Sequence, residues 1–304
     1  MRISTSWAQQ TAVNSMLDQQ SRLNQTQMQM STGKKILTSS DDPAAAARII
    51  DLNQSIKQTE QYQSNINAAR QRLTMEDGVL HSAIDILQRI NELGIQGLSD
   101  TSSQSVRTTI AVEMEGLNQQ LLGLANTKNA NGEYLFSGFK SVAQAFSKNM
   151  ADGGYIYAGD TNQRTIQIGE TRQIADGDPG SNVFGTPTSS LPAAGSNTNI
   201  FEAIDRFAAD LRSNTPNSAT LGDVSSALNK ITTVQSSVGT RLNALDSQED
   251  LNGDFILHTK AVLSTTEDLD YAEAISRFNL QTVSLQAAQQ AFTQVKKLSL
   301  FNYL

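Results

Sequence analysis

The sequence predicts a mainly α-helical fold: an elongated nested helical bundle with paired terminal helices and a small β-containing insertion domain. Apolar residues recur at spacings of three and four over most of the 304 residues, which is the pattern of amphipathic helices. The pattern stops only in residues 139–199, where Gly, Ser, Thr, Asn and Asp are abundant. Hydrophobic content is 38% and charged content 17%, both below typical globular values, so the sequence predicts a thin, partly polar core.

These changes of pattern divide the chain into three predicted domains. Residues 1–42 and 266–304 form a terminal-helix coiled-coil layer, residues 43–138 and 200–265 form a long-helix bundle domain, and residues 139–199 form a β-rich insertion domain. Because the chain leaves and returns through the same elements, the layers should be nested, with the two ends of the chain paired.

Composition excludes several classes of protein. The net charge of −7 argues against a nucleic-acid partner, whose phosphates attract basic stripes. The absence of cysteine excludes disulfides and cysteine-based metal sites. No apolar run reaches the length of a membrane span, and the first residues lack the apolar region of a cleavable signal peptide. We therefore expect a protein that is cytoplasmic or is exported by a route that needs no such signal.

Residues 5–31 are expected to form the first helix. Val13, Met16 and Leu23 share one seam of it with Gln20 and Gln27. A seam this rich in Gln and Met would hardly fold alone. Two interpretations stay open: an ordinary amphipathic helix, or a segment that becomes ordered only on assembly.

A strong helix start follows at residues 41–43. Asp42 can cap exposed amides, and Pro43 suits the first helical position, so Asp41 and Asp42 are interpreted as caps rather than metal ligands. The helical pattern then runs to about residue 98, and we expect Gly78 within it to let another helix approach closely. A second helix follows over residues 106–124 and should lie antiparallel to the first.

The insertion and the return path follow. Residues 155–158 and 165–168 are predicted to be strands on either side of a turn at 159–162, in an insertion that we expect to be exposed. Helix returns at Asn199, and the most regular heptad of the chain covers residues 221–245.

The last stretch, residues 267–304, carries two apolar stripes on different faces. The first recurs every seventh residue from Phe278, and the second contains Leu280, Val283, Ala287, Ala291 and Leu298. Two stripes require neighbours on two sides, which we expect to be the N-terminal helix and adjacent subunits. The apolar end of the chain also suggests burial. The predicted assembly interface comprises Val13, Met16, Leu23, Phe278, Leu285, Phe292, Val295, Leu298, Leu300, Phe301, Tyr303 and Leu304.

No catalytic, cofactor-binding or metal site is predicted. His81 and His258 are the only histidines, and neither lies in a zinc-binding pattern. No serine lies in a Gly-x-Ser-x-Gly elbow, and residues 250–254 lack the spacing and the closing Glu of a calcium loop. The sequence therefore indicates a structural or interaction protein rather than an enzyme.

Four motifs occur in a characteristic order. They are STGKKI at 31–36 with DDPA at 41–44, NGEYLFSG at 131–138, DLDYAEA at 268–274, and SLFNYL at 299–304. In this order they resemble the flagellin superfamily, and within it the hook-associated proteins of the hook–filament junction. The resemblance covers roughly residues 1–140 and 200–304. True flagellins typically have Gly rather than the Pro-Ala run after the paired acids and end in a Leu-Leu-Arg-like tail.

The resemblance implies a structural adaptor of the bacterial flagellum, joining the hook side to the filament, and an extracellular location reached by flagellar type III export. It implies four kinds of partner: the other junction protein (hook-associated protein 1), flagellin, further copies in a helical ring, and an export chaperone that binds the C-terminal region. A flagellin filament subunit is the alternative within the superfamily. Periodicity alone also leaves open an intracellular coiled-coil adaptor.

Overall fold

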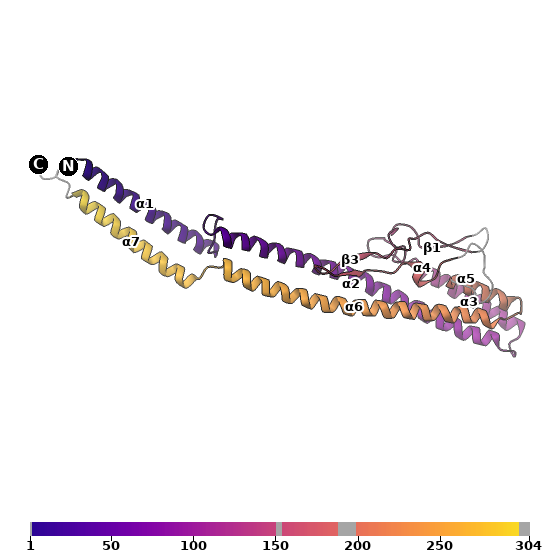
Figure 1. Ribbon diagram of the computed structural model, residues 1–304. Coiled ribbons are helices and arrows are strands. Elements are labelled where there is room, and N and C mark those ends of the chain that lie inside the picture. Colours follow the sequence, from indigo (N-terminus) through magenta and orange to yellow (C-terminus); the bar gives the residue numbers. More distant parts are fainter. Residues whose placement is uncertain (1, 150–153, 188–198, 298–304) are drawn as a thin grey trace. The chain divides into compact units, whose positions relative to one another are not determined.

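The computed structural model describes residues 2–149, 154–187 and 199–297 and confirms a mainly helical fold with a small β region (Figure 1). The elements in chain order are α1 (Arg2–Thr32), α2 (Pro43–Leu98), α3 (Gln104–Ala125), β1 (Phe146–Lys148), β2 (Tyr155–Tyr157), β3 (Thr165–Gln167), β4 (Gln173–Ala175), α4 (Gly180–Val183), α5 (Ile200–Arg212), α6 (Ser218–Glu267) and α7 (Tyr271–Lys297).

Side-chain caps set where several helices begin. Asp42 Oδ1 accepts hydrogen bonds from the backbone N–H groups of Ala44 (3.1 Å) and Ala45 (3.0 Å), as its position before Pro43 predicts. Asn199 caps α5 and Asp270 caps α7 in the same way, each accepting from two backbone N–H groups. The predicted helix starts at Pro43 and after Asn199 are therefore confirmed.

The chain forms two compact units. The first unit comprises residues 1–58 and 254–304, and the second comprises residues 59–253. Both α2 and α6 contribute residues to each unit. The division into three domains drawn from composition stays a prediction.

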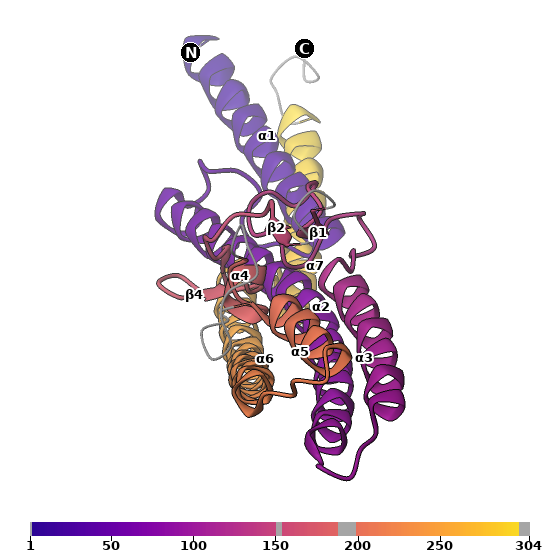
Figure 2. The same ribbon diagram turned by 90° about the vertical axis from the view of Figure 1, so that its right-hand side faces the viewer.

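In the second unit, α3 runs back along α2, as predicted, and packs closely on α5 (Figure 2). The heptad of α6 supplies Val224, Ile231, Val238 and Leu245, all without exposed surface. An aromatic cluster extends this core under the strands, with ring centroids 4.9–5.7 Å apart. Its members are Phe136, Phe146, Tyr155, Tyr157, Phe184 and Phe201.

Each of the two predicted strands is present and pairs with another strand. β2 pairs antiparallel with β1, with Phe146 opposite Tyr157, and β3 pairs antiparallel with β4, with Thr165 opposite Ala175. The expectation of an exposed insertion is wrong for residues 176–181. Residues 176–181 are buried because polar groups of α2 and α6 hold this segment. Glu76 Oε1 accepts from the backbone N–H of Asp178 (3.1 Å), and Arg241 forms an ion pair with the Asp178 carboxylate.

The expected close approach at Gly78 is also wrong. Gly78 is exposed, and no atom would come within 4 Å of a Cβ placed there. Close approach occurs instead at Gly94 and Gly97, where a Cβ would lie 2.6–2.7 Å from side-chain carbons of Phe207, Leu221 and Leu211. These two glycines let α2 meet α5 and α6.

Candidate assembly interface

The terminal helices α1 and α7 pack against each other (Figure 1). On α1, Val13, Met16 and Leu23 are half-buried. On α7, Phe278 and Phe292 are half-buried, and Leu285 is 8% exposed. The first of the two predicted stripes of α7 is therefore the covered one.

The seam between these helices is thin. Among the described side chains of α1 and α7, only Thr26, Gln29, Ala274 and Leu285 are buried. Oε1 of Gln281 is buried without a hydrogen-bond partner in the described part of the chain, and leaving such a group unpaired costs about 1–3 kcal/mol. The pair therefore gains little stability from its own seam.

The segments that leave α1 and enter α7 also pair with each other. We call residues 33–35 and 267–269 the clasp. The backbone N–H of Lys35 donates to the carbonyl oxygen of Glu267 (2.7 Å), and that of Leu269 donates to Gly33 (2.9 Å). The Lys34 ammonium pairs with the Glu267 carboxylate. Gly33 has φ +72°, a left-handed conformation that glycine adopts without strain. The clasp fixes the start of α7 beside the end of α1.

Asp41 orders the rest of the connector between α1 and α2. Its Oδ2 accepts from the backbone N–H groups of Thr38 (2.9 Å) and Leu37 (3.0 Å). These hydrogen bonds, that of Thr38 first, lower the pKa of the Asp41 carboxyl below its ordinary value. Both acids thus bind backbone amides, but only Asp42 caps α2 as predicted, whereas Asp41 binds amides of the connector that precedes it.

The second predicted stripe of α7 is uncovered. Leu280 and Val283 are 68% and 62% exposed, and Ala287 and Ala291 are exposed with them. α1 likewise exposes Leu17 and Met28, among other residues. Neighbouring exposed apolar side chains of this kind mark interaction surfaces. The side chain of Val295 and the residues Leu298, Leu300, Phe301, Tyr303 and Leu304 of the predicted interface lie outside what the structure describes.

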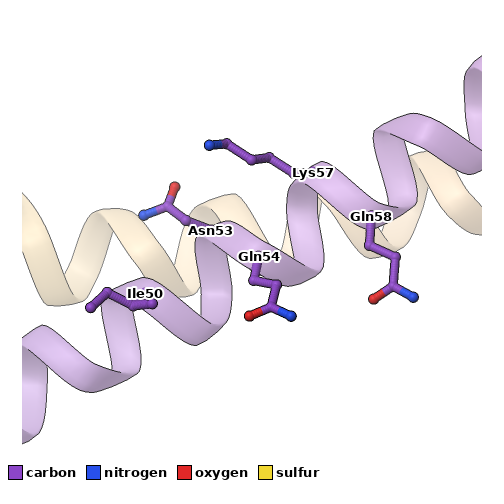
Figure 3. Close-up of a pocket in the computed structure, with 5 residues that line it drawn as sticks. All are labelled: Ile50, Asn53, Gln54, Lys57 and Gln58. Carbon is purple, nitrogen blue, oxygen red and sulfur yellow. The ribbon is translucent and has the colours of Figure 1, made fainter.

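Sequence reasoning missed a further exposed apolar surface in the first unit. Ile50 is 62% exposed and lines a shallow pocket on α2 together with Asn53, Gln54, Lys57 and Gln58 (Figure 3). On α6, Phe255, His258 and Val262 are exposed at spacings of three and four. That spacing was the available signal, since residues three and four apart lie on one face of a helix.

In the ranges that the structure describes, no three His, Asp or Glu side chains gather to hold a metal ion. None of the described helices combines the length and the apolar character that a membrane crossing requires.

Comparison with known proteins identifies the family. The model of the bacterial flagellin N-terminal helical region matches residues 3–141, and that of the C-terminal helical region matches residues 221–304. The chain is 31% identical to flagellar hook-associated protein 3 of Escherichia coli over 99% of both chains. The chain belongs to the flagellar hook-associated protein 3 family. It is accordingly a structural component of the bacterial flagellum.

Two further relatives place the hook-associated protein 3 family within the superfamily. The crystal structure of hook-associated protein-3 from Legionella pneumophila is similar with a TM-score of 0.65 and 27% identity, covering 71% of this chain and 98% of that one. Flagellin of Bacillus subtilis is 24% identical over 98% of this chain and 97% of its own. Flagellin is thus a more distant relation than hook-associated protein 3.

Proposed function

We propose that the chain is the structural adaptor that joins the hook side of a bacterial flagellum to its flagellin filament. One observation carries the proposal: α7 covers its first apolar stripe against α1 and leaves the second, around Leu280 and Val283, without a cover. A helix with two apolar faces needs a second neighbour. The full-length similarity to hook-associated protein 3 supports a neighbour within the flagellum.

The proposal names the partners. Further copies of the chain form a helical ring, hook-associated protein 1 contacts it on the hook side, and flagellin contacts it on the filament side. Before assembly, an export chaperone covers the C-terminal region, and flagellar type III export carries the protein out of the cell. No catalytic step and no cofactor form part of this function.

Within the assembly, α1 and α7 form the inner, tube-lining layer. The thin seam supports this, because burial of so few apolar side chains offsets little of the entropy lost on ordering two long helices. The interface comprises the seam residues, the outer stripe of α7 and the apolar end of the chain.

The test changes the outer stripe of α7 and leaves its seam intact. The double variant Leu280→Lys, Val283→Lys is expected to be exported but absent from isolated appendages, with loss of motility in cells that lack the unaltered chain. Ile156→Lys is the matched control, because Ile156 is exposed on β2 in the second unit. Normal incorporation of the double variant would refute the interface.

Labelling decides between this role and the alternative of a filament subunit. Electron microscopy with a label on the chain should mark only the hook–filament junction. Label along the whole filament would instead assign the chain to the filament. An intracellular coiled-coil adaptor does not fit a member of a flagellar family.

A further inference from the structure

A small pocket of the second unit is lined by two guanidinium groups. Arg72 comes from α2, and Arg164 comes from the residue before β3. The side chains of Gln71, Asn129 and Asn131, with the Glu133 carboxylate, line the pocket beside them. Guanidinium and amide N–H groups are hydrogen-bond donors, and the wall therefore offers many donors around one small space.

Arg72 is the least satisfied of these groups. Its side chain is 8% exposed, and Nη2 donates to the carbonyl oxygen of Leu135 (3.0 Å). Nε and Nη1 have no hydrogen-bond partner among the described residues. A buried guanidinium with unpaired N–H groups is unfavourable unless an acceptor reaches it.

Most of the nearby carboxyl groups either pair with other arginines or are protonated. Asp176 accepts hydrogen bonds from Arg164, including two from Nε at 3.0 and 2.9 Å. Asp178 is paired with Arg241. Burial, with the negative charge of Asp178, raises the pKa of Glu76 to about 8, so that this carboxyl is mostly protonated at neutral pH.

Glu133 is the carboxylate that lines the pocket itself. Its Oε2 lies 3.5 Å from Arg72 Nη1, and the same atom accepts from Asn129 Nδ2 (2.9 Å). Burial, followed by the positive charge of Arg164, lowers the pKa of Arg72 below its ordinary value. The carboxylates around Arg72 therefore do not fully offset its burial and the repulsion from Arg164.

We propose that this pocket binds one small oxyanion, such as inorganic phosphate or sulfate, between the guanidinium groups of Arg72 and Arg164. The planar donor edges of arginine suit the paired oxygens of such an anion. Because Arg164 is 40% exposed, an anion can reach the pocket from solvent. The Glu133 carboxylate occupies part of the same space and competes with the ligand. This site is independent of the proposed adaptor role.

The test is anion binding by the full chain, measured by calorimetry and by the thermal unfolding midpoint. Inorganic phosphate and sulfate are compared with chloride at equal ionic strength, and both oxyanions should raise the Tm in a saturable way, whereas chloride should not. Gln71→Glu adds a negative charge at the pocket and should weaken binding about tenfold. Gln88→Glu makes the same charge change at an exposed position of α2 that does not line the pocket, and should leave binding unchanged.

Two further variants sharpen the result. Glu133→Gln removes the competing charge and should tighten phosphate binding several-fold, and Arg164→Lys should weaken it while keeping a cation beside Asp176. An equal response to acetate would support the pocket and widen its ligand to single carboxylates, including an acidic side chain of a neighbouring molecule. No response to phosphate and sulfate, or equal weakening by Gln71→Glu and Gln88→Glu, would overturn the proposal.

Discussion

The inner face of α6 changes character between the two units. In the second unit its heptad presents Val224, Ile231, Val238 and Leu245, all fully buried. The same seven-residue step then leads to Asn252, at the end of the second unit, and to Thr259 and Thr266 in the first unit. The backbone is helical throughout. The helical spacing of residues therefore continues through both units. Only in the second unit are the side chains at these positions large and apolar enough to form a core that is stable without a partner.

The two units also differ in net charge. The first unit contains 10 Lys and Arg residues against 9 Asp and Glu, whereas the second contains 13 against 21. Copies of a nearly neutral unit can pack closely at little electrostatic cost, while strongly acidic surfaces repel one another. The thin seam and the balanced charge of the first unit both suit a part of the chain that is completed by neighbours.

The largest expected effect comes from a cavity in the core of the second unit, which should destabilise that unit alone. Phe207 is fully buried in the second unit, and Phe207→Ala should destabilise that unit by about 3–5 kcal/mol. Leu285→Ala, in the terminal seam, should leave the unfolding of the second unit unchanged and reduce incorporation into the appendage. Denaturant unfolding followed by the near-ultraviolet circular dichroism of the tyrosines measures the second unit, because Tyr155 and Tyr157 lie in its aromatic cluster. Equal losses for both variants would contradict the comparison.

The next effect concerns pH and belongs to the second unit alone. Burial first, and then the charge of Asp178, raises the pKa of Glu76 from 4.5 to about 8. Between these two values the folded chain holds a proton that the unfolded chain has lost, so stability falls as pH rises through this window and is constant above it. The fall is on the order of 5 kcal/mol.

Glu76→Gln tests this linkage. The amide oxygen can still accept from the backbone N–H of Asp178, and the side chain has no proton to lose. The free energy of unfolding of the variant should be close to that of the unaltered chain at pH 5 and higher than it at pH 9. Between these values it should change less with pH. Urea unfolding at pH 5, 7 and 9 measures it. If the stability of the two proteins changes with pH in parallel, the pH dependence belongs to groups other than Glu76.

Much of the helical layout could be predicted from the sequence. The helix starts at Pro43 and after Asn199 and the heptad of α6 depend on local signals, since caps and apolar spacing act within a few turns. The covered stripe of α7 was also recognisable, because Leu285 follows Phe278 by seven residues. These features need no knowledge of distant partners.

Features that join distant segments were not predictable in the same way. The clasp pairs Lys35 with Glu267 through the backbone, which leaves no pattern in the side chains. Burial of residues 176–181 depends on Glu76 and Arg241, which come from helices about a hundred and sixty residues apart in sequence. Composition rich in Gly, Asp and Ser resembles an exposed loop unless these partners are known. Gly78 was misjudged for the same reason, because a glycine does not reveal what faces it.

The smallest expected effects use two glycines of α2 as a matched pair. At Gly94 an added Cβ would lie 2.6 Å from carbons of Phe207 and Leu221, so Gly94→Ala should overpack the core and cost about 1–3 kcal/mol. At Gly78 the same methyl group meets nothing within 4 Å, and Gly78→Ala should stabilise the helix by about 0.5–1 kcal/mol. Both changes remove the same backbone freedom from the unfolded chain. The difference between their unfolding free energies therefore isolates packing, and similar values would mean that α2 does not approach α5 and α6 closely at Gly94.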